Sequence, residues 1–218
     1  QVLRVEPHSV IALRNKGLML RELGNLDAAQ TALRQALALH PDHHDTRCSL
    51  AMVLIEQGFF EEAEFHRDNV LATAGPSHVE ARWHLSIANL MQGRFMEGWS
   101  YYKSRLSRHD TWKRPYDHPE WDGRSIAGGT VLVYAEQGLG DDILFASCIP
   151  DALLRTERCV VECDPRLCDL FRRSFPGATI VGSKFDADPV WLKDDSGISA
   201  QIASGSLPGM FQIGRAHV

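Results

Sequence analysis

The sequence predicts a multidomain chain in which an all-α array of helical hairpins is followed by an α/β region with a parallel sheet. Two observations predict this fold class. A repeat of 34 or 35 residues runs through the first half, and after about residue 107 the helical spacing of apolar residues gives way to short apolar runs. We expect the repeats over residues 1–106, a linker over 107–129 and the α/β region over 130–212.

Glycines and prolines mark the repeat in the first half. The recurring residues are Pro7, Pro41 and Pro76, and Gly24, Gly58 and Gly93. Each glycine lies between two segments with helical spacing, and it ends the first helix because glycine accepts left-handed backbone dihedrals. Each proline closes the second helix of a unit. This pattern predicts about three hairpins, preceded by the tail of an earlier one.

The first complete unit, residues 10–43, carries small and large apolar residues at fixed places. They are Gly17, Leu20, Ala29, Leu33, Ala36 and Pro41. This pattern resembles the tetratricopeptide repeat (TPR), although Arg67 and Gly98 depart from it in later units. The resemblance implies a TPR solenoid whose concave face binds a protein or peptide.

Some O-GlcNAc transferases, which also join TPRs to a transferase domain, hold peptide with asparagines at a fixed repeat position. In this chain Asn15 holds that position in the first unit, but Ser49 and His84 replace it in the next two. Asparagine thus holds the position in one unit only. The sequence leaves a protein acceptor open but does not support one.

The second half alternates short apolar runs with helical patterns. The expected strands are 130–135, 159–163 and 178–181, and the expected helices are 143–149 and 167–175. This alternation predicts right-handed βαβ units and a parallel sheet. The linker over 107–129 is rich in proline, glycine and aromatic residues, so we expect it to be ordered but not helical.

The loop after the first expected strand, residues 136–142, is the place where chemistry is expected. Ligands of parallel open sheets lie beyond the carboxyl ends of the strands. One alternative is a dinucleotide site, with Glu162 or Asp164 as the acid after the second strand. It lacks a third glycine, since Ile143 stands there, and Asp141 and Asp142 would face a negatively charged pyrophosphate.

In the other alternative, the loop serves to present the carboxylate of Asp141 for catalysis. Asp141 is expected to cap the following helix, where the helix dipole and amide donors keep a carboxylate ionised. Such a carboxylate could deprotonate a sugar hydroxyl as the hydroxyl attacks an activated donor. The plainer interpretation is that Asp141 only caps the helix while the glycines only make the turn.

Four sequence blocks carry a further resemblance. They are Phe95-x-x-Gly98-Trp99, Pro119-x-Trp121-Asp122-Gly123, Ala135-Glu136-Gln137-Gly138-Leu139-Gly140-Asp141 and Ser206-Leu207-Pro208. Together they resemble bacterial proteins in which TPR arrays precede a heptosyltransferase-like GT-B glycosyltransferase domain. The stretch from Val131 to Pro150 is similar to the opening strand, loop and helix of that domain.

The resemblance implies roles for the loop and for the chain. The α/β region would be the N-terminal Rossmann-like half of a GT-B domain, with Asp141 as catalytic base. The substrate-binding residues would be Gln137, Gly138, Leu139 and Gly140. The substrate would be a nucleotide sugar, with no metal or other cofactor. Because that family binds the donor mainly in its second half, this chain alone is expected to be an inactive fragment. The alternative function is a non-catalytic TPR scaffold for protein–protein interaction.

Composition excludes several other classes of function. A net charge of −5 gives no basic footprint for nucleic acid or for a membrane surface, and no apolar stretch is long enough to span a bilayer. The five cysteines follow no zinc or redox spacing, so a reducing, cytoplasmic compartment is expected. The histidine-rich run at 40–45 falls on a turn between repeats and is expected to be solvated surface, with no metal.

Both ends of the sequence carry their own expectation. Gln1 is not an initiator residue, which is typical of a fragment. The last six residues, 213–218, equal the translation of a common sequencing adapter up to its stop codon, so we expect them to be an artefact outside the fold.

Overall fold

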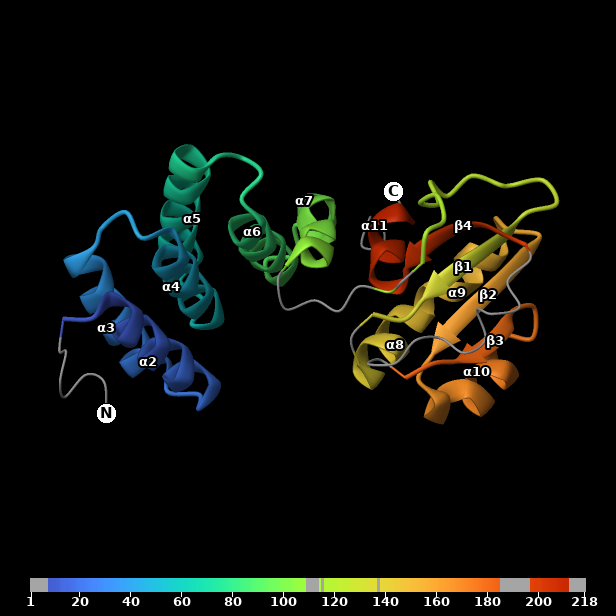
Figure 1. Ribbon diagram of the computed structural model, residues 1–218, viewed down its shortest axis with the longest axis horizontal. Coiled ribbons are helices and arrows are strands. Elements are labelled where there is room, and N and C mark those ends of the chain that lie inside the picture. Colours follow the sequence, from blue (N-terminus) through green and yellow to red (C-terminus); the bar gives the residue numbers. More distant parts are fainter. Residues whose placement is uncertain (1–7, 109–113, 115, 137, 185–196, 212–218) are drawn as a thin grey trace. The chain divides into compact units, whose positions relative to one another are not determined.

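A computed structural model describes residues 8–108, 114, 116–136, 138–184 and 197–211. The chain divides into two compact units, Gln1–Arg108 and His109–Val218 (Figure 1). The first consists of helices and the second contains the sheet, as the change of period predicts.

Residues 8–108, the described part of the first unit, form three helical hairpins. Its helices are α2 (Val10–Glu22), α3 (Leu26–Leu39), α4 (His44–Glu56), α5 (Phe60–Ala74), α6 (Val79–Met91) and α7 (Phe95–Tyr102), followed by the 3-10 helix η1 (Lys103–Ser107). Consecutive helices pair as α2 with α3, α4 with α5 and α6 with α7. The three hairpins confirm the predicted repeat.

Glycines have two distinct roles in these hairpins. Gly24 has a φ of +74° at the turn between α2 and α3, a left-handed conformation that side chains disfavour. Gly17 instead permits close packing, because a Cβ there would lie 2.6 Å from Leu33 Cγ on α3. A Cβ on Gly98 would likewise lie 2.7 Å from Leu90 Cγ, so the departure from alanine at Gly98 has a packing reason.

The second unit contains a four-stranded, fully parallel sheet in the order β3-β2-β1-β4. Its strands are β1 (Thr130–Tyr134), β2 (Arg158–Cys163), β3 (Thr179–Gly182) and β4 (Ile198–Ala203). The parallel sheet and its first three strands confirm the prediction. β4 was not predicted.

Short helices follow the strands of this sheet. They are α8 (Leu139–Phe145), η2 (Ala146–Cys148), α9 (Ile149–Leu153), η3 (Pro165–Leu167), α10 (Cys168–Ser174), η5 (Ser204–Ser206) and α11 (Leu207–Met210). Their apolar residues and those of the sheet form one buried core that includes Val131, Val133, Val161, Phe171 and Ile202.

The start of the helix after β1 differs from the prediction. Asp141 is not the N-cap: Gly138 holds that place in an extended conformation, and the amide of Asp142 donates to Gly138 O at 3.0 Å. Asp141 therefore lies within the first turn of α8. The expected single helix over 143–149 begins earlier and is divided by η2, with Pro150 in the first turn of α9. Proline fits such a position because the first turn needs no amide donor there.

The described part of the predicted linker is ordered and packs on β4. Trp121 is buried, and its amide donates to Gln201 O at 2.7 Å. The Gln201 amide in turn donates to Pro119 O at 2.9 Å, and the Gln201 side chain donates to His118 O at 2.9 Å. The segment thus extends the α/β unit at the outer edge of β4.

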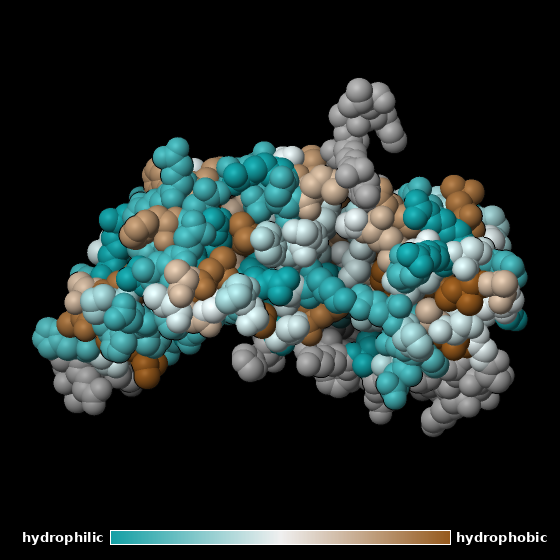
Figure 2. All heavy atoms as spheres, turned by 90° about the horizontal axis from the view of Figure 1, so that it is seen from above, coloured by the Kyte–Doolittle hydropathy of each residue, from teal (hydrophilic) through white to brown (hydrophobic). Residues whose placement is uncertain are grey.

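On the face drawn in Figure 2, brown apolar side chains are scattered among teal hydrophilic ones over the helical unit at the left. Within the described residues, no helix is both long enough and apolar enough to cross a bilayer.

Candidate functional site

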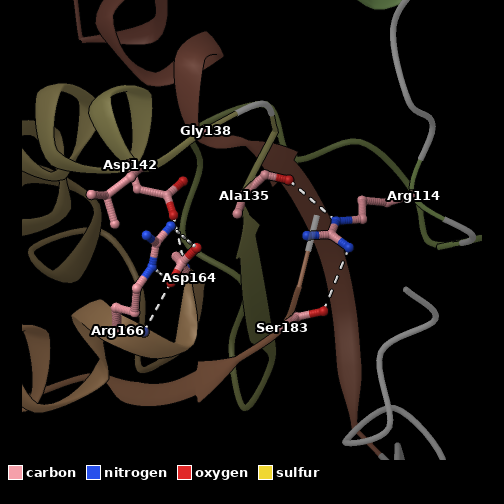
Figure 3. A pocket seen from close by; sticks show the side chains of 8 residues that line it. Arg114, Ala135, Gly138, Asp142, Asp164, Arg166 and Ser183 are labelled. Carbon is pink, nitrogen blue, oxygen red and sulfur yellow. Dashed lines mark hydrogen bonds and ion pairs between the residues drawn. The ribbon is translucent and has the colours of Figure 1, made fainter. Parts of the chain in front are cut away.

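The carboxyl ends of β1, β2 and β3 share one edge of the sheet, because these strands are parallel and adjacent. A pocket of about 160 Å³ lies there (Figure 3). Its lining residues are Arg114, Ala135, Gly138, Leu139, Asp142, Asp164, Arg166 and Ser183. The pocket therefore occupies the edge at which parallel sheets place their ligands.

Asp142 supplies a buried carboxylate to this pocket. Its Oδ2 accepts a hydrogen bond from the Asp164 amide at 2.8 Å, which ties the first turn of α8 to the end of β2. Burial raises the pKa of Asp142 to about 6, and the negative charges of Asp164, Glu162 and Asp141 act in the same direction. The hydrogen bond from the Asp164 amide opposes the rise without cancelling it.

Half-buried Asp164 and exposed Arg166 form an ion pair in the lining of the pocket. Arg166 Nε and Nη2 donate to the two carboxylate oxygens of Asp164, each at 2.9 Å, and the Arg166 amide donates to Oδ1 at 2.9 Å. The side-chain and backbone hydrogen bonds from Arg166 lower the pKa of Asp164 to about 2. The pocket is thus lined by one carboxyl group with a raised pKa, that of Asp142, and by one with a lowered pKa, that of Asp164.

A buried ion pair fixes the strand ends on the other side of the pocket. Arg114 Nε lies 3.4 Å from Glu162 Oε2, and the two side chains are 2 % and 0 % exposed. Glu162 also accepts hydrogen bonds from the Tyr116 hydroxyl at 2.8 Å and from the Ala135 amide at 3.1 Å. Burial is the first cause that raises the pKa of Tyr116 far above its ordinary value, followed by the charge of Glu162.

Arg114 also forms hydrogen bonds with the residues that follow β1 and β3. It donates to Ala135 O at 3.4 Å, to Ser183 Oγ at 3.5 Å and to Lys184 O at 3.0 Å. Figure 3 shows its guanidinium across the pocket from Arg166. Arg114 belongs to the predicted linker, so the sequence did not indicate it. For Glu162, the sequence carries one signal of a structural role: it is an acidic residue within an otherwise apolar expected strand.

The predicted site residues are only partly brought together. Gly138 and Leu139 line the pocket, whereas Gly140 is exposed and Asp141 is half-buried in the first turn of α8. Gln137 lies outside the described residues. Asp142, whose charge the sequence indicates only as unfavourable to a bound dinucleotide, is the α8 carboxylate that lines the pocket. The role of Asp141 as base stays a prediction.

The other candidate groups have simple structural positions. All five cysteines are buried and free, and Cys163 Sγ lies 3.8 Å from Cys168 Sγ. His43 lies in the histidine-rich run and caps α4, with Nδ1 accepting the Thr46 amide at 3.2 Å. Among the described residues, no group of three or more His, Cys, Asp or Glu side chains is placed to hold a metal ion.

Comparisons with known proteins identify the repeats. Residues 20–90, from the end of α2 to near the end of α6, match the tetratricopeptide repeat family, so the repeats within this span are TPRs. The chain is 25% identical over 189 residues to the protein FlbA of Caulobacter vibrioides, which covers 84% of this chain and 32% of FlbA. The chain therefore spans about a third of the length of this curated relative.

A solved structure shares a partial likeness. It is a mutant O-GlcNAc transferase of Thermobaculum terrenum, 19% identical, with a TM-score of 0.46 over 85% of this chain and 36% of that one.

Proposed function

We propose that the chain is part of a TPR-containing glycosyltransferase, which transfers a sugar from a nucleotide-sugar donor to an acceptor. The pocket at the strand ends carries this proposal, because it is lined by the loop after β1 and by carboxyl groups. The sheet order β3-β2-β1-β4 supports a Rossmann-like half, since nucleotide-binding sheets of that type begin with the order 3-2-1-4. The four sequence blocks support the heptosyltransferase-like GT-B assignment.

In this proposal Asp141 is the general base. It lies in the first turn of α8, between the pocket-lining residues Leu139 and Asp142. The carboxylate would take the proton of an acceptor hydroxyl while the hydroxyl oxygen attacks the anomeric carbon of the donor. The nucleoside diphosphate would leave with the bonding electrons. Gly138, Leu139 and Gly140 would let the substrate approach the backbone.

The TPR unit would bring a protein or peptide partner to the enzyme through its concave face. We place the protein in the cytoplasm, because all five cysteines are free thiols, which a reducing compartment maintains. No metal or further cofactor is needed by this reaction as proposed.

The test uses the full-length parent protein, since the donor is expected to bind mainly to a second half. Sugar transfer from a panel of nucleotide sugars is followed by mass spectrometry of the acceptor fraction. We expect Asp141→Asn to lower kcat by about 100-fold or more, as loss of a general base does, with the fold intact. Unchanged transfer in this variant removes Asp141 from the mechanism.

The competing function is a non-catalytic TPR scaffold. It predicts that the wild-type parent neither transfers nor hydrolyses any nucleotide sugar, while it still binds a protein partner. That result would refute the glycosyltransferase proposal.

A further inference from the structure

The turns that join the two helices of each hairpin carry exposed apolar side chains. We define the turn edge as residues 21–27, 55–61 and 90–97, each with a glycine of positive φ. Its large exposed apolar residues are Leu23, Phe59, Met91, Phe95 and Met96. Leu23 is 76 % exposed and Phe59 is 54 % exposed, so this edge offers contact area that the repeat core does not use.

Side-chain contacts hold neighbouring turns side by side. Gln57 Nε2 in the second turn donates to Asp27 Oδ1 beside the first turn at 2.9 Å. Arg94 in the third turn donates to Glu64 Oε1 on α5 at 2.5 Å. The first and second turns are therefore joined directly, and the third turn is joined to α5.

A pocket of about 420 Å³ opens between the first two turns. Its lining residues are Gly24, Asn25, Leu26, Asp27, Gln57 and Phe59. Leu26 and Phe59 give it apolar walls, and Asp27 gives it a carboxylate. The Gln57 Oε1 atom is buried and has no hydrogen-bond partner among the described residues.

The charge of the turn edge is negative. It contains Glu22, Asp27, Glu56, Glu61 and Glu97 against Arg21 and Arg94, which is a formal charge of −3. Both arginines are already paired with carboxylates: Arg21 Nε lies 2.7 Å from Glu56 Oε1, and Arg94 Nη2 contacts Glu64. An apolar and acidic surface fits a basic and apolar partner and repels anionic lipid.

We propose that the turn edge binds a polypeptide segment that carries both basic and apolar side chains. A lysine or arginine of the segment enters the pocket between the first two turns. Its aliphatic stem lies against Leu26 and Phe59, and its charge meets Asp27. The apolar residues of the segment cover Leu23 and the exposed residues of the neighbouring turns. This site is separate from the concave face and does not depend on the proposed transferase activity.

The test titrates the ¹⁵N-labelled chain with the peptide acetyl-Leu-Lys-Lys-Leu-Leu-Lys-Lys-Leu-amide. The matched probe replaces each lysine by glutamate. We expect the lysine peptide to shift the amide resonances of Gly24, Gly58 and Asp27, and the glutamate peptide to leave them in place. Shifts confined to Arg14, Ser49 and their neighbours on the first helices of the repeats would assign the peptide to another surface and overturn the proposal.

Two variants and a control examine the chemistry of the site. Asp27→Lys should lower the affinity for the lysine peptide about 10-fold. It should also give measurable binding of the glutamate peptide, as expected when one charge of a close pair is reversed. Phe59→Ser should lower the affinity for the lysine peptide by a similar factor, because apolar contact is lost. The control Phe65→Ser removes a 65 % exposed apolar side chain on α5, outside the turn edge, and should leave the affinity unchanged.

Several results would contradict the proposal. Equal weakening by Phe65→Ser and Phe59→Ser would show non-specific association. Absence of binding at millimolar lysine peptide would exclude a basic partner. Concentration-dependent self-association that Phe59→Ser abolishes would mean that a second copy of the chain occupies this surface instead. The amide spectrum of each variant verifies that its fold is retained.

Discussion

The two units of this chain are stabilised in different ways. In the TPR unit, small and apolar residues recur at the same places in each hairpin, and Ala29, Leu33, Leu54 and Ala63 are buried in one shared core. In the α/β unit, the site depends on single contacts between segments that are distant in sequence, such as Arg114 with Glu162. Repetition spreads stability over many equivalent contacts, whereas the strand-end pocket concentrates it in a few polar ones.

The largest expected effect comes from breaking the buried ion pair. Arg114→Met leaves the Glu162 carboxylate buried without its cation, which costs about 3–5 kcal/mol for pairs of this kind. Native-state hydrogen exchange of the Val131–Val133 amides should report this loss in the α/β unit. The double variant Arg114→Met/Glu162→Gln should recover much of it, since no uncompensated charge remains. Unchanged exchange in the single variant would show that stability is not concentrated at this pair.

A close approach in the TPR unit should give the next largest effect. Gly17→Ala places a Cβ 2.6 Å from Leu33 Cγ, and such overpacking costs about 1–3 kcal/mol. Exchange of amides in α2 and α3 should accelerate, while amides of the sheet keep their protection. If the sheet responds as strongly as the helices, the two units do not unfold separately.

The pKa of Asp142 predicts a pH-dependent effect. Because the folded-state pKa is about 6 and the ordinary value is 3.8, the folded chain holds more protons between these values and loses stability as the pH rises. Asp142→Asn removes this loss and retains an oxygen acceptor for the Asp164 amide. We expect the variant to be more stable above pH 6, by on the order of 1 kcal/mol after allowance for screening by solvent, and equally stable near pH 4.

Thermal unfolding across this pH range measures that prediction. An equal gain at pH 4 and pH 8 would mean that the ionisation of Asp142 is not its cause.

Substitutions of two exposed glycines, one in each unit, should give the smallest changes in the free energy of unfolding. Gly24→Ala should cost about 1 kcal/mol, because φ is +74° and the added Cβ meets no atom within 4 Å. Gly138→Ala should cost under about 0.5 kcal/mol, since φ is −152° and nothing lies within 4 Å there either. Chemical denaturation of the two variants makes the comparison. A large cost at Gly138 would show a structural need that its geometry does not reveal.

Much of the fold could be predicted from local pattern. The period of 34 or 35 residues located the three hairpins, and the apolar runs located β1, β2 and β3. β4 was missed because its six residues, Ile198–Ala203, alternate weakly and include Ser199 and Gln201. The helix after β1 was placed too late, because an acidic residue is a common N-cap and Gly138 holds that place by backbone conformation alone.

Local sequence pattern is enough to predict the helical array, the parallel sheet and the strand-end loop, because periodicity and glycine placement act over a few neighbouring residues. Long-range contacts alone select Asp142 as the α8 carboxylate that lines the pocket, and they bring Arg114, from the start of the second unit, to its side. Those outcomes depend on contacts such as Asp142 with the Asp164 amide, and Arg114 with Glu162 and Ser183. Local sequence pattern does not indicate which distant residues a folded sheet brings within hydrogen-bond distance.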